Sequence, residues 1–553
     1  MPCRRGAFAP RRPGGGPRGA RPARHRPGLD HRRGRAAAAA RLLGRSRRHG
    51  RVLHGAVAQT RLIRAGAIVI TRDPRNGAGD SSLVDFQMPL SHRLSPATGL
   101  ALLLVCAAVL IREWLGEGVL GLLPVILTAL LLALLTLQVR KGRQVFVAIG
   151  LCLTLILALS DDNWRATVLK GLGTAGFIAA FFTALASLRS AAGSSASMSR
   201  AGRFLAQQPP GRRYLALTLG GQLFALVLNY GSIALLGGLA SDAAEAEPDA
   251  EIRGHRRRRM LLAIQRAFVS MLTWSPLSFS IAVSIALIPG ATWPDVVLPG
   301  IVSSLLMAGT GWALDTIFRP RLNQPRPAFR PPEGNWRLLT PLFILLGLLV
   351  IAVVLLTWLT GIRVVGIVLL VVPLLAVAWV LLQRREDPTA ASLGQRSRRF
   401  FWTEMAGYHG ELTLLMMAGY IGTVGAPILT PLLLASGLDP LGLPVWAILL
   451  CIIWIIPALG QLGMNPILAV TLLAPMVPSA AAMGLSPAAI IVAITAGWAL
   501  SGASSPFTAT TLLIGSFANI SAARVGLVWN GAFTLTAGAV MSLWVLIHAL
   551  WLG

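Results

Sequence analysis

Hydrophobic residues form long apolar runs from about residue 97 to the C-terminus. A helix that crosses the hydrocarbon core of a bilayer needs about 20 apolar residues in a row, and most of these runs are long enough. The pattern predicts an all-α polytopic membrane protein with about 11 transmembrane helices plus two re-entrant hairpins. The apolar segments are 97–111, 118–139, 144–160, 167–188, 214–240, 261–289, 295–314, 338–360, 362–382, 402–424, 444–477, 486–516 and 524–552.

Two of these segments have lengths that suit neither one crossing nor two. Segment 214–240 is long for a single span, and segment 444–477 is interrupted by two prolines and two glycines between 457 and 466. Non-helical backbone at membrane depth is tolerated only where protein or a water-filled cavity covers it. We therefore predict that each segment is a re-entrant hairpin.

Two further segments contain a polar interruption that ends in proline. In 261–289 the interruption is Thr-Trp-Ser-Pro at 273–276, and in 486–516 it is Ser-Gly-Ala-Ser-Ser-Pro at 501–506. Proline lacks a backbone donor and clashes with the preceding turn, so each segment is predicted to be one discontinuous helix.

The two halves of the chain repeat the same order of elements. Each half has a span, a hairpin with an asparagine (Asn229 or Asn465) and a broken helix with Ser-Pro, and the hairpins share the motif Gly-Gln-Leu. The first half enters the membrane from outside and the second from inside, which predicts inverted repeats of the kind found in secondary transporters. The predicted organisation is scaffold helices at 97–160, repeat one at 161–318, linking scaffold helices at 338–383 and repeat two at 400–553.

Composition and charge agree with a membrane location. The chain is 54% hydrophobic and only 13% charged, whereas soluble proteins contain about 25% charged residues. Basic clusters such as Arg256–Arg259 and those in 384–399 are assigned to the cytoplasm by the positive-inside rule, and loops 290–294 and 425–443 have no basic residue. Only a hairpin at 214–240 keeps the basic loops on one side. This predicts a bacterial inner-membrane protein with a cytoplasmic N-terminus and a periplasmic C-terminus.

Residues 1–87 differ from the rest and carry 20 of the 50 Lys and Arg residues. Arg, Gly, Pro and Ala dominate this extension, which is predicted to be disordered. One interpretation is a basic arm that binds nucleic acid or anionic lipid. We favour the other, an over-extended gene start with translation from Met88, because the arm lacks interspersed aromatic residues. On that interpretation we expect that the chain binds no nucleic acid and that it contacts the lipid bilayer.

The order of elements resembles the ion transporter superfamily, which includes divalent-anion/sodium symporters, arsenite permeases and sodium/proton antiporters. Asn465-Pro466 is similar to the Asn-x-Pro hairpin motif of the arsenite and antiporter branch. The Ser-Ser-Pro-Phe-Thr break at 504–508 is similar to the Ser/Thr-Pro-rich break of the superfamily. The chain lacks the symporters' Ser-Asn-Thr signature and the Asp that precedes Asn in the antiporters. The resemblance implies a homodimer with 97–160 and 338–382 as scaffold.

Broken helices expose backbone polar groups inside the membrane. Half-helix N-termini suit an anion, whereas carbonyl, Asn, Ser and Thr oxygens suit Na⁺. We hypothesise that Asn229 and the break at 273–280 form one ion site, and that Asn465 and the break at 501–510 form a second. The alternative is that the Ser and Thr hydroxyls only bond to helix carbonyls. The predicted substrate- and ion-binding residues are Asn229, Ser232, Ser275, Ser278, Ser280, Asn465, Ser504, Ser505, Thr508 and Thr510.

Few ionisable residues lie within the apolar segments. Glu404 and Glu411 share segment 402–424, and on one continuous helix they would lie about 20° apart on one face. An acid inside the membrane is by default a functional hypothesis, so both are candidates for proton coupling. In the alternative, Glu404 faces interfacial water. Arg266 is interpreted as a residue that snorkels to the membrane surface, with a counter-ion role as the alternative.

These features predict a secondary active transporter that moves a small anionic solute, such as a carboxylate, coupled to Na⁺ or H⁺ by elevator-like alternating access. The lack of Asp at the hairpin tips favours an anion over the alternatives, a cation/proton antiporter or an oxyanion exporter. A membrane enzyme would need converging acids and histidines, and a channel would not need two broken-helix units. The only such group, Glu404, His409 and Glu411, does not converge, so no enzymatic activity is predicted. No cysteine pair has metal-ligand spacing, and no metal site or cofactor is predicted.

Overall fold

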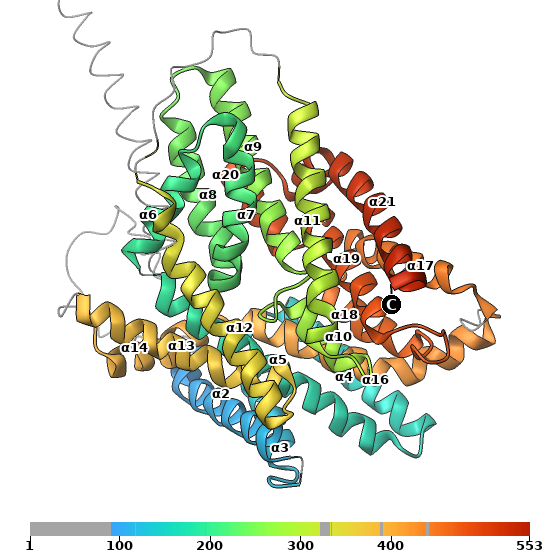
Figure 1. Cartoon of the computed structure of the whole chain (residues 1–553). Coiled ribbons are helices and arrows are strands. Elements are labelled where there is room, and N and C mark those ends of the chain that lie inside the picture. Colours follow the sequence, from blue (N-terminus) through green and yellow to red (C-terminus); the bar gives the residue numbers. More distant parts are fainter. Residues whose placement is uncertain are drawn as a thin grey trace, which may run out of the picture. The chain divides into compact units, whose positions relative to one another are not determined.

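The computed structural model consists of helices throughout the residues it describes (Figure 1). The N-terminal extension 1–87 and the proposed start at Met88 lie outside those residues. The described residues are 90–116, 118–193, 195–320, 332, 334–386, 391–437 and 442–552.

Nine helices among the described residues are long and apolar enough to cross a membrane. Three shorter apolar helices, Leu123–Gln138, Val445–Gln461 and Pro466–Met476, accompany them. The chain is therefore an all-helical multi-pass membrane protein, as predicted, while the total of 11 spans and the re-entrant course of the hairpins remain predictions. The nine are Leu94–Leu115, Lys141–Ser160, Trp164–Gly193, Trp293–Ile317, Trp336–Thr360, Val364–Arg385, His409–Leu432, Pro487–Ala518 and Gly531–Trp551.

One group of helices surrounds α5 and α16, which pack closely against each other. α5 also contacts α2, α3 and α13, and α16 also contacts α4. Figure 1 shows α2, α3, α13 and α14 together on one side of the bundle. The bounds are α2 Leu90–Leu115, α3 Leu123–Gln138, α4 Lys141–Ser160, α5 Trp164–Gly193, η1 Trp336–Leu339, α12 Thr340–Thr360, α13 Val364–Glu386, α14 Leu393–Arg399, η2 Phe400–Glu404, α15 Met405–Gly407 and α16 His409–Ala435.

The remaining helices form two series with the same order. In the first series a helix pair (α7, α8) is followed by a helix broken between α9 and α10 and then by α11; α17 to α21 repeat this order. α11 and α21 pack against each other, as α5 and α16 do. The bounds are α6 Ala196–Ala206, α7 Pro210–Leu228, α8 Tyr230–Glu245, α9 Ala250–Met271, α10 Phe279–Leu287, α11 Trp293–Ile317, α17 Val445–Gln461, α18 Pro466–Leu473, η4 Ala474–Met476, α19 Pro487–Ser504, α20 Ala509–Ala518, η5 Arg524–Trp529, α21 Gly531–Ile547 and η6 His548–Leu552.

Most of the interval between the apolar segments 97–111 and 118–139 is helical in the structure, because α2 continues to Leu115. The charged end of α2 has partners within the protein. Both Glu113 carboxylate oxygens accept from Nη2 of Arg363 (3.0 and 2.9 Å), and the Trp114 indole donates to the Gly366 carbonyl (3.1 Å). The start of α13 is thereby fixed to the end of α2.

The predicted span 402–424, which contains Glu404 and Glu411, differs from the structure at both ends. Glu404 ends a short π-helix, and α16 begins only at His409 after a turn at Tyr408. The two acids are therefore not on one continuous helix, and the 20° separation does not apply. α16 then runs to Ala435 through two prolines, where the sequence predicted an outer loop from residue 425. Membrane helices tolerate proline because neighbouring groups satisfy the freed carbonyls.

Close packing of α11 against the first break generates a stability prediction. A methyl group at Gly300 would lie 2.4 Å from the Thr273 carbonyl oxygen and 3.0 Å from Trp274 Cα, which are backbone atoms that cannot move aside easily. Gly300→Ala should therefore destabilise the protein by about 1–3 kcal/mol, as other overpacked sites do. Thermal unfolding in detergent measures this.

Gly309→Ala is the matched control, since Gly309 lies on the same helix with nothing within 4 Å of its Cβ position. An unchanged melting temperature for both variants would contradict the close approach of α11 to the break.

Candidate functional site

The first break is closed by the hydroxyl groups of three serines. Ser275 Oγ accepts from the Leu277 amide (3.2 Å), and Ser278 Oγ donates to the Ser275 carbonyl (2.8 Å). Ser280 Oγ donates back across the break to the carbonyl of Leu272, at the end of α9. All three serines are buried. The hydroxyls therefore satisfy backbone groups that the missing helical turn leaves free.

The second break has the same hydrogen-bond pattern at the matching positions. Ser505 Oγ accepts from the Phe507 amide (3.2 Å), Thr508 Oγ1 donates to the Ser505 carbonyl (3.0 Å), and Thr510 Oγ1 donates to the Gly502 carbonyl. The repeat seen in the sequence thus extends to individual atoms. Thr511, which the sequence analysis missed, also donates to the Ser505 carbonyl (2.6 Å).

The two helix pairs turn at the predicted asparagines. Asn229 has φ +49° and ψ −131°, its Oδ1 accepts from the Tyr230 amide (2.8 Å), and Ser232 Oγ donates to its carbonyl (2.7 Å). At the second turn, Asn465 Oδ1 accepts from the Ile467 amide (2.8 Å) at the start of α18. In this conformation, both side chains cap helices.

The end of α17 is a Schellman motif, which sets the direction of the second turn. Gly463 has φ +90°, its amide donates to the Gly460 carbonyl (3.2 Å), and the Met464 amide donates to the Leu459 carbonyl (3.1 Å). A positive φ of this kind favours glycine.

A glutamine in each helix pair bonds to the residue just before the Ser-Pro of its own repeat. The Trp274 indole donates to Gln222 Oε1 (2.9 Å), and Gln461 Nε2 donates to Ser504 Oγ (3.2 Å). The Ser505 hydroxyl also donates to the Gly460 carbonyl (2.6 Å). Neither glutamine was among the predicted site residues, although the repeated Gly-Gln-Leu motif marks both positions.

The two breaks lie next to each other. A methyl group at Gly502 would lie 3.8 Å from Leu272 Cδ1, so the end of α19 is close to the end of α9. Beyond the breaks, α10 packs against α18 and α19, and α20 packs against α8 and α9. Each second half-helix therefore contacts the helix pair of the other repeat.

The two breaks differ in exposure and in capping. The hydroxyls of the first break are buried, whereas Phe507 of the second is 62% exposed and Thr508 is partly exposed. Ser278 Oγ caps α10 by accepting from the Ile281 amide (3.3 Å), but no side chain caps α20 at Thr508. The second break thus offers the more accessible and less satisfied half-helix N-terminus.

A cavity of about 1100 Å³ lies between α3, α5, α10, α16 and α18. Its lining includes three basic side chains, Arg112, Lys170 and Arg363, and one acid, Glu113. Threonine hydroxyls on α5, α16 and α18 line the same space. An excess of positive charge among hydroxyl groups suits an anion.

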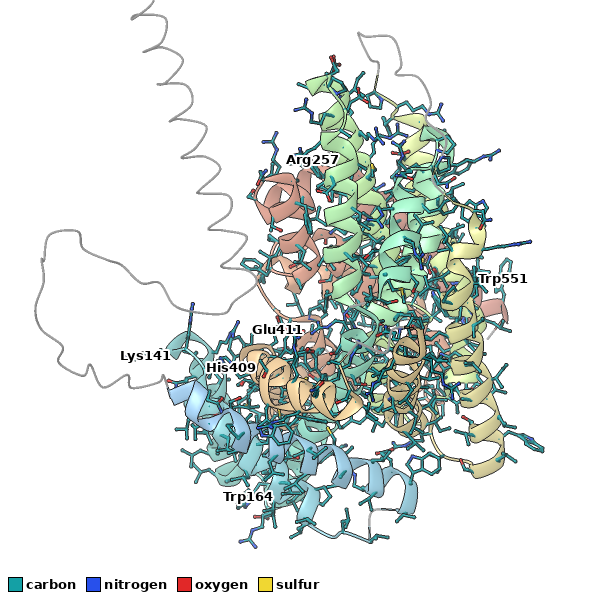
Figure 2. The ribbon with its side chains drawn as sticks, turned by 90° about the vertical axis from the view of Figure 1, so that its left-hand side faces the viewer. Lys141, Trp164, Arg257, His409, Glu411 and Trp551 are labelled. Carbon is teal, nitrogen blue, oxygen red and sulfur yellow. The ribbon has the colours of Figure 1, made fainter. Side chains whose placement is uncertain are left out.

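The two predicted proton-coupling acids are both accessible. Glu404 lies 3.5 Å from Arg399 Nε, and Glu411 is exposed in the first turn of α16. Figure 2 shows Glu411 beside His409 at the same end of that helix.

Aromatic side chains connect the start of α16 with the first break. Tyr408 packs edge-on against Phe182 (5.6 Å between centroids), and Phe182 lies 6.3 Å from Phe279, the first residue of α10. The Arg189 guanidinium lies 4.5 Å from the Tyr408 ring. The end of α5, the start of α16 and the first break therefore form one packed unit.

Arg266 does not snorkel. It is only 5% exposed, and its guanidinium donates to Asn530 and Tyr214 inside the protein. The prediction was wrong because the position of an arginine in the sequence does not reveal whether other helices cover it.

Arginines also gather in the N-terminal parts of α7 and α9, away from the breaks. Burial, together with repulsion from Arg256 and Arg259, lowers the pKa of Arg213 to about 10, so its guanidinium remains charged at neutral pH. Arg259 is paired with Asp315 through both carboxylate oxygens (2.8 and 2.5 Å). This end of the helix group is strongly basic.

Two solved transporter structures share this fold. The YdaH transporter of Alcanivorax borkumensis, described as having an unusual topology, is 15% identical with a TM-score of 0.50, over 73% of this chain and 98% of that one. MtrF of Neisseria gonorrhoeae, described with a class of antimetabolite efflux pumps, is 13% identical with a TM-score of 0.50, over 73% and 95% of the two chains. No protein-family model and no curated protein matches the sequence.

The positive φ of Asn229 generates a prediction that separates the role of its backbone conformation from the role of its side-chain amide. Its positive φ is strained for most residues, so Asn229→Ala should lower the free energy of unfolding by about 1–3 kcal/mol. Asn229→Gly removes the same amide but relieves the strain, and should be clearly more stable than the alanine variant. Thermal unfolding of both variants measures the difference; equal stability would show that the strained turn does not persist in solution.

Proposed function

We propose that the chain is a secondary active transporter for a small anionic solute, and that the solute binds at the second break. The observation that supports this most directly is the uncapped N-terminus of α20 beside the exposed Phe507 and the partly exposed Thr508. A half-helix N-terminus attracts negative charge through its free amides and its dipole. The turn that contains Asn465 lies beside this break, because a methyl group at Gly463 would lie 3.8 Å from the Phe507 ring, and it adds a side-chain amide.

The cavity supports the same class of solute. Three basic residues and one acid line it, and it borders α10 and α18, which belong to the paired broken helices and turns. A solute entering this space would meet a positive potential before it reached the breaks. The two solved structures named above are both transporters, which supports transport rather than enzymatic activity.

The proposed movement is an elevator-like displacement of the broken helices and turns against the group around α5 and α16. The contact between Gly422 of α16 and Thr471 of α18 lies on this boundary. Coupling would use Na⁺, bound by Asn, Ser and Thr oxygens at the turns, or H⁺, bound by Glu411. We propose the inner membrane as the location, with the basic ends of α7 and α9 in the cytoplasm.

Thermal stability of the purified full-length protein tests the solute class. The panel contains dicarboxylates, tricarboxylates, oxyanions and amino acids, each with and without Na⁺. Binding at a hundredfold excess over Kd should stabilise the protein by about 2.7 kcal/mol. A shift with one anion that requires Na⁺ would identify solute and coupling ion together. A pH-dependent shift with Na⁺ or Li⁺ alone would instead support a cation/proton antiporter.

Asn465→Ala and Ser505→Ala should each abolish the anion-induced shift and transport while leaving expression intact. Asn465 caps α18, and the Ser505 hydroxyl joins the Gly460 carbonyl to the break, so both substitutions change the proposed site. Ser516→Ala is the control, because Ser516 lies further along α20 and its hydroxyl donates to the Leu513 carbonyl in its own turn (2.7 Å). Unchanged transport in the first two variants would refute the assignment of the site.

Glu411→Gln tests proton coupling. If Glu411 carries the proton, the variant should lose the pH dependence of uptake in proteoliposomes, because glutamine does not titrate between pH 5 and 9. Glu404→Gln is measured beside it, because Glu404 is the second candidate. The control is Glu251→Gln, which changes an exposed acid in the first turn of α9. Wild-type pH profiles in both Glu411→Gln and Glu404→Gln would rule out proton coupling through these acids and leave Na⁺ as the proposed coupling ion.

A further inference from the structure

A chain of buried polar side chains links the two repeats. Gln265 and Arg266 are consecutive residues of α9, and Asn530 lies between η5 and α21. Gln265 and Asn530 are fully buried, and Arg266 is 5% exposed. Polar groups in such surroundings are costly unless they are hydrogen-bonded, so their partners indicate what the chain is for.

The hydrogen bonds run in one direction, from Arg266 to the second break. Arg266 Nε donates to Asn530 Oδ1 (3.2 Å), and Asn530 Nδ2 donates to Gln265 Oε1 (2.9 Å). Gln265 Nε2 then donates to the carbonyls of Ala503 (3.3 Å) and Gly502 (3.4 Å), at the end of α19.

The arginine fixes this direction. A guanidinium has only donors, so Asn530 must turn its oxygen towards Arg266 and its amide nitrogen towards Gln265. The second amide hydrogen of Asn530 reaches the Val525 carbonyl (3.3 Å), which stabilises the same orientation. Gln265 must therefore present its oxygen to Asn530 and its nitrogen to the break. A reversed amide at either position would set two acceptors or two donors against each other.

Arg266 is itself held in place from several sides. Nη1 donates to the Tyr214 hydroxyl (3.1 Å) and the Gly311 carbonyl (3.4 Å), and the guanidinium lies 4.5 Å from the Phe533 ring. Among the ion pairs of the described residues, none involves Arg266. Its charge is therefore used for the neutral polar chain rather than for a carboxylate.

The two breaks differ in this respect. The Gly502 carbonyl receives the Thr510 hydroxyl of its own break and, in addition, the amide of Gln265 from the other repeat. The matching carbonyl of the first break, that of Leu272, receives Ser280 and Ser278, both from its own repeat. Within the described residues, an amide donor from the opposite repeat thus reaches this carbonyl in the second break and not in the first.

We propose that Gln265 is a positioning residue for the second break, and that Arg266, through Asn530, fixes the orientation in which it acts. By holding the Gly502 and Ala503 carbonyls, Gln265 keeps the end of α19 aligned with the uncapped start of α20. The inference rests on the proposed function in that this break is taken as the solute site. The positioning itself is a property of the polypeptide and is measurable without any solute.

Asn530→Asp is the decisive variant. Aspartate has nearly the same shape and still accepts from Arg266, but it has no donor for Gln265, so the chain is interrupted in its middle. Tyr214→Phe is the control: it removes one partner of Arg266 and leaves the bond from Asn530 to Gln265 intact. Gln265→Met, which removes the final donor without adding charge, serves if the aspartate variant does not fold.

The readout is the rate at which a thiol reagent labels a cysteine at each break. Thr510→Cys reports on the second break and Ser280→Cys on the first; both positions are buried and donate across their breaks. The native cysteines are replaced by alanine in all variants.

Asn530→Asp should raise the labelling rate of the Thr510→Cys reporter at least about tenfold, the effect expected when a buried hydrogen bond is lost and the local structure opens more often. The Ser280→Cys reporter should not change, and Tyr214→Phe should affect neither. Equal rates in Asn530→Asp and wild type would overturn the proposal. So would a parallel increase at both breaks, since that indicates general loosening.

The same variants separate this inference from the proposed function. If no anion shifts the stability of the wild-type protein but Asn530→Asp opens the second break selectively, the positioning role stands and the solute class fails. If an anion binds and Asn530→Asp neither weakens that binding nor changes the labelling rate, the positioning role fails and the transporter proposal stands.

Discussion

Backbone hydrogen bonding at membrane depth is the constraint on which the rest of this structure depends. A helix that stops inside a bilayer leaves carbonyl and amide groups without water to satisfy them. At both breaks the chain solves this with hydroxyl side chains: Ser278 and Ser280 in the first, Thr508 and Thr510 in the second. Glycines allow the close packing around them, because Gly300 and Gly526 bring neighbouring helices onto the backbone of each break.

The same solution, used twice, leaves the two breaks chemically different. The first is buried, and Ser278 caps its second half-helix. The second is partly exposed, its second half-helix is uncapped, and its carbonyl end receives a donor from the opposite repeat. An internal repeat therefore produces one closed element and one element with amides free to meet a ligand. This difference supports the assignment of the solute to the second break.

The sequence predicted the features that follow from local chemistry and missed those that follow from packing. Ser-Pro within an apolar run indicated both breaks, and Asn229 and Asn465 marked both turns, because proline and polar caps act within a few residues. The position of Glu411 could not be predicted, since the π-helix before it and the turn at Tyr408 change the helical phase. Nor could the burial of Arg266, which depends on partners far away in the sequence.

Arg266 also shows how a membrane protein can use a buried charge without an ion pair. A guanidinium inside an apolar bundle is expensive, and several neutral acceptors together with an aromatic ring reduce that cost. In return, a group that can only donate fixes the orientation of each amide that follows it. Because Gln265 and Arg266 belong to one repeat and the carbonyls of Gly502 and Ala503 to the other, the second break is held by contacts between the repeats in addition to those within its own repeat. A site of this kind keeps its geometry only while the two broken helices move together, which is what an elevator-like displacement of both against α5 and α16 would preserve.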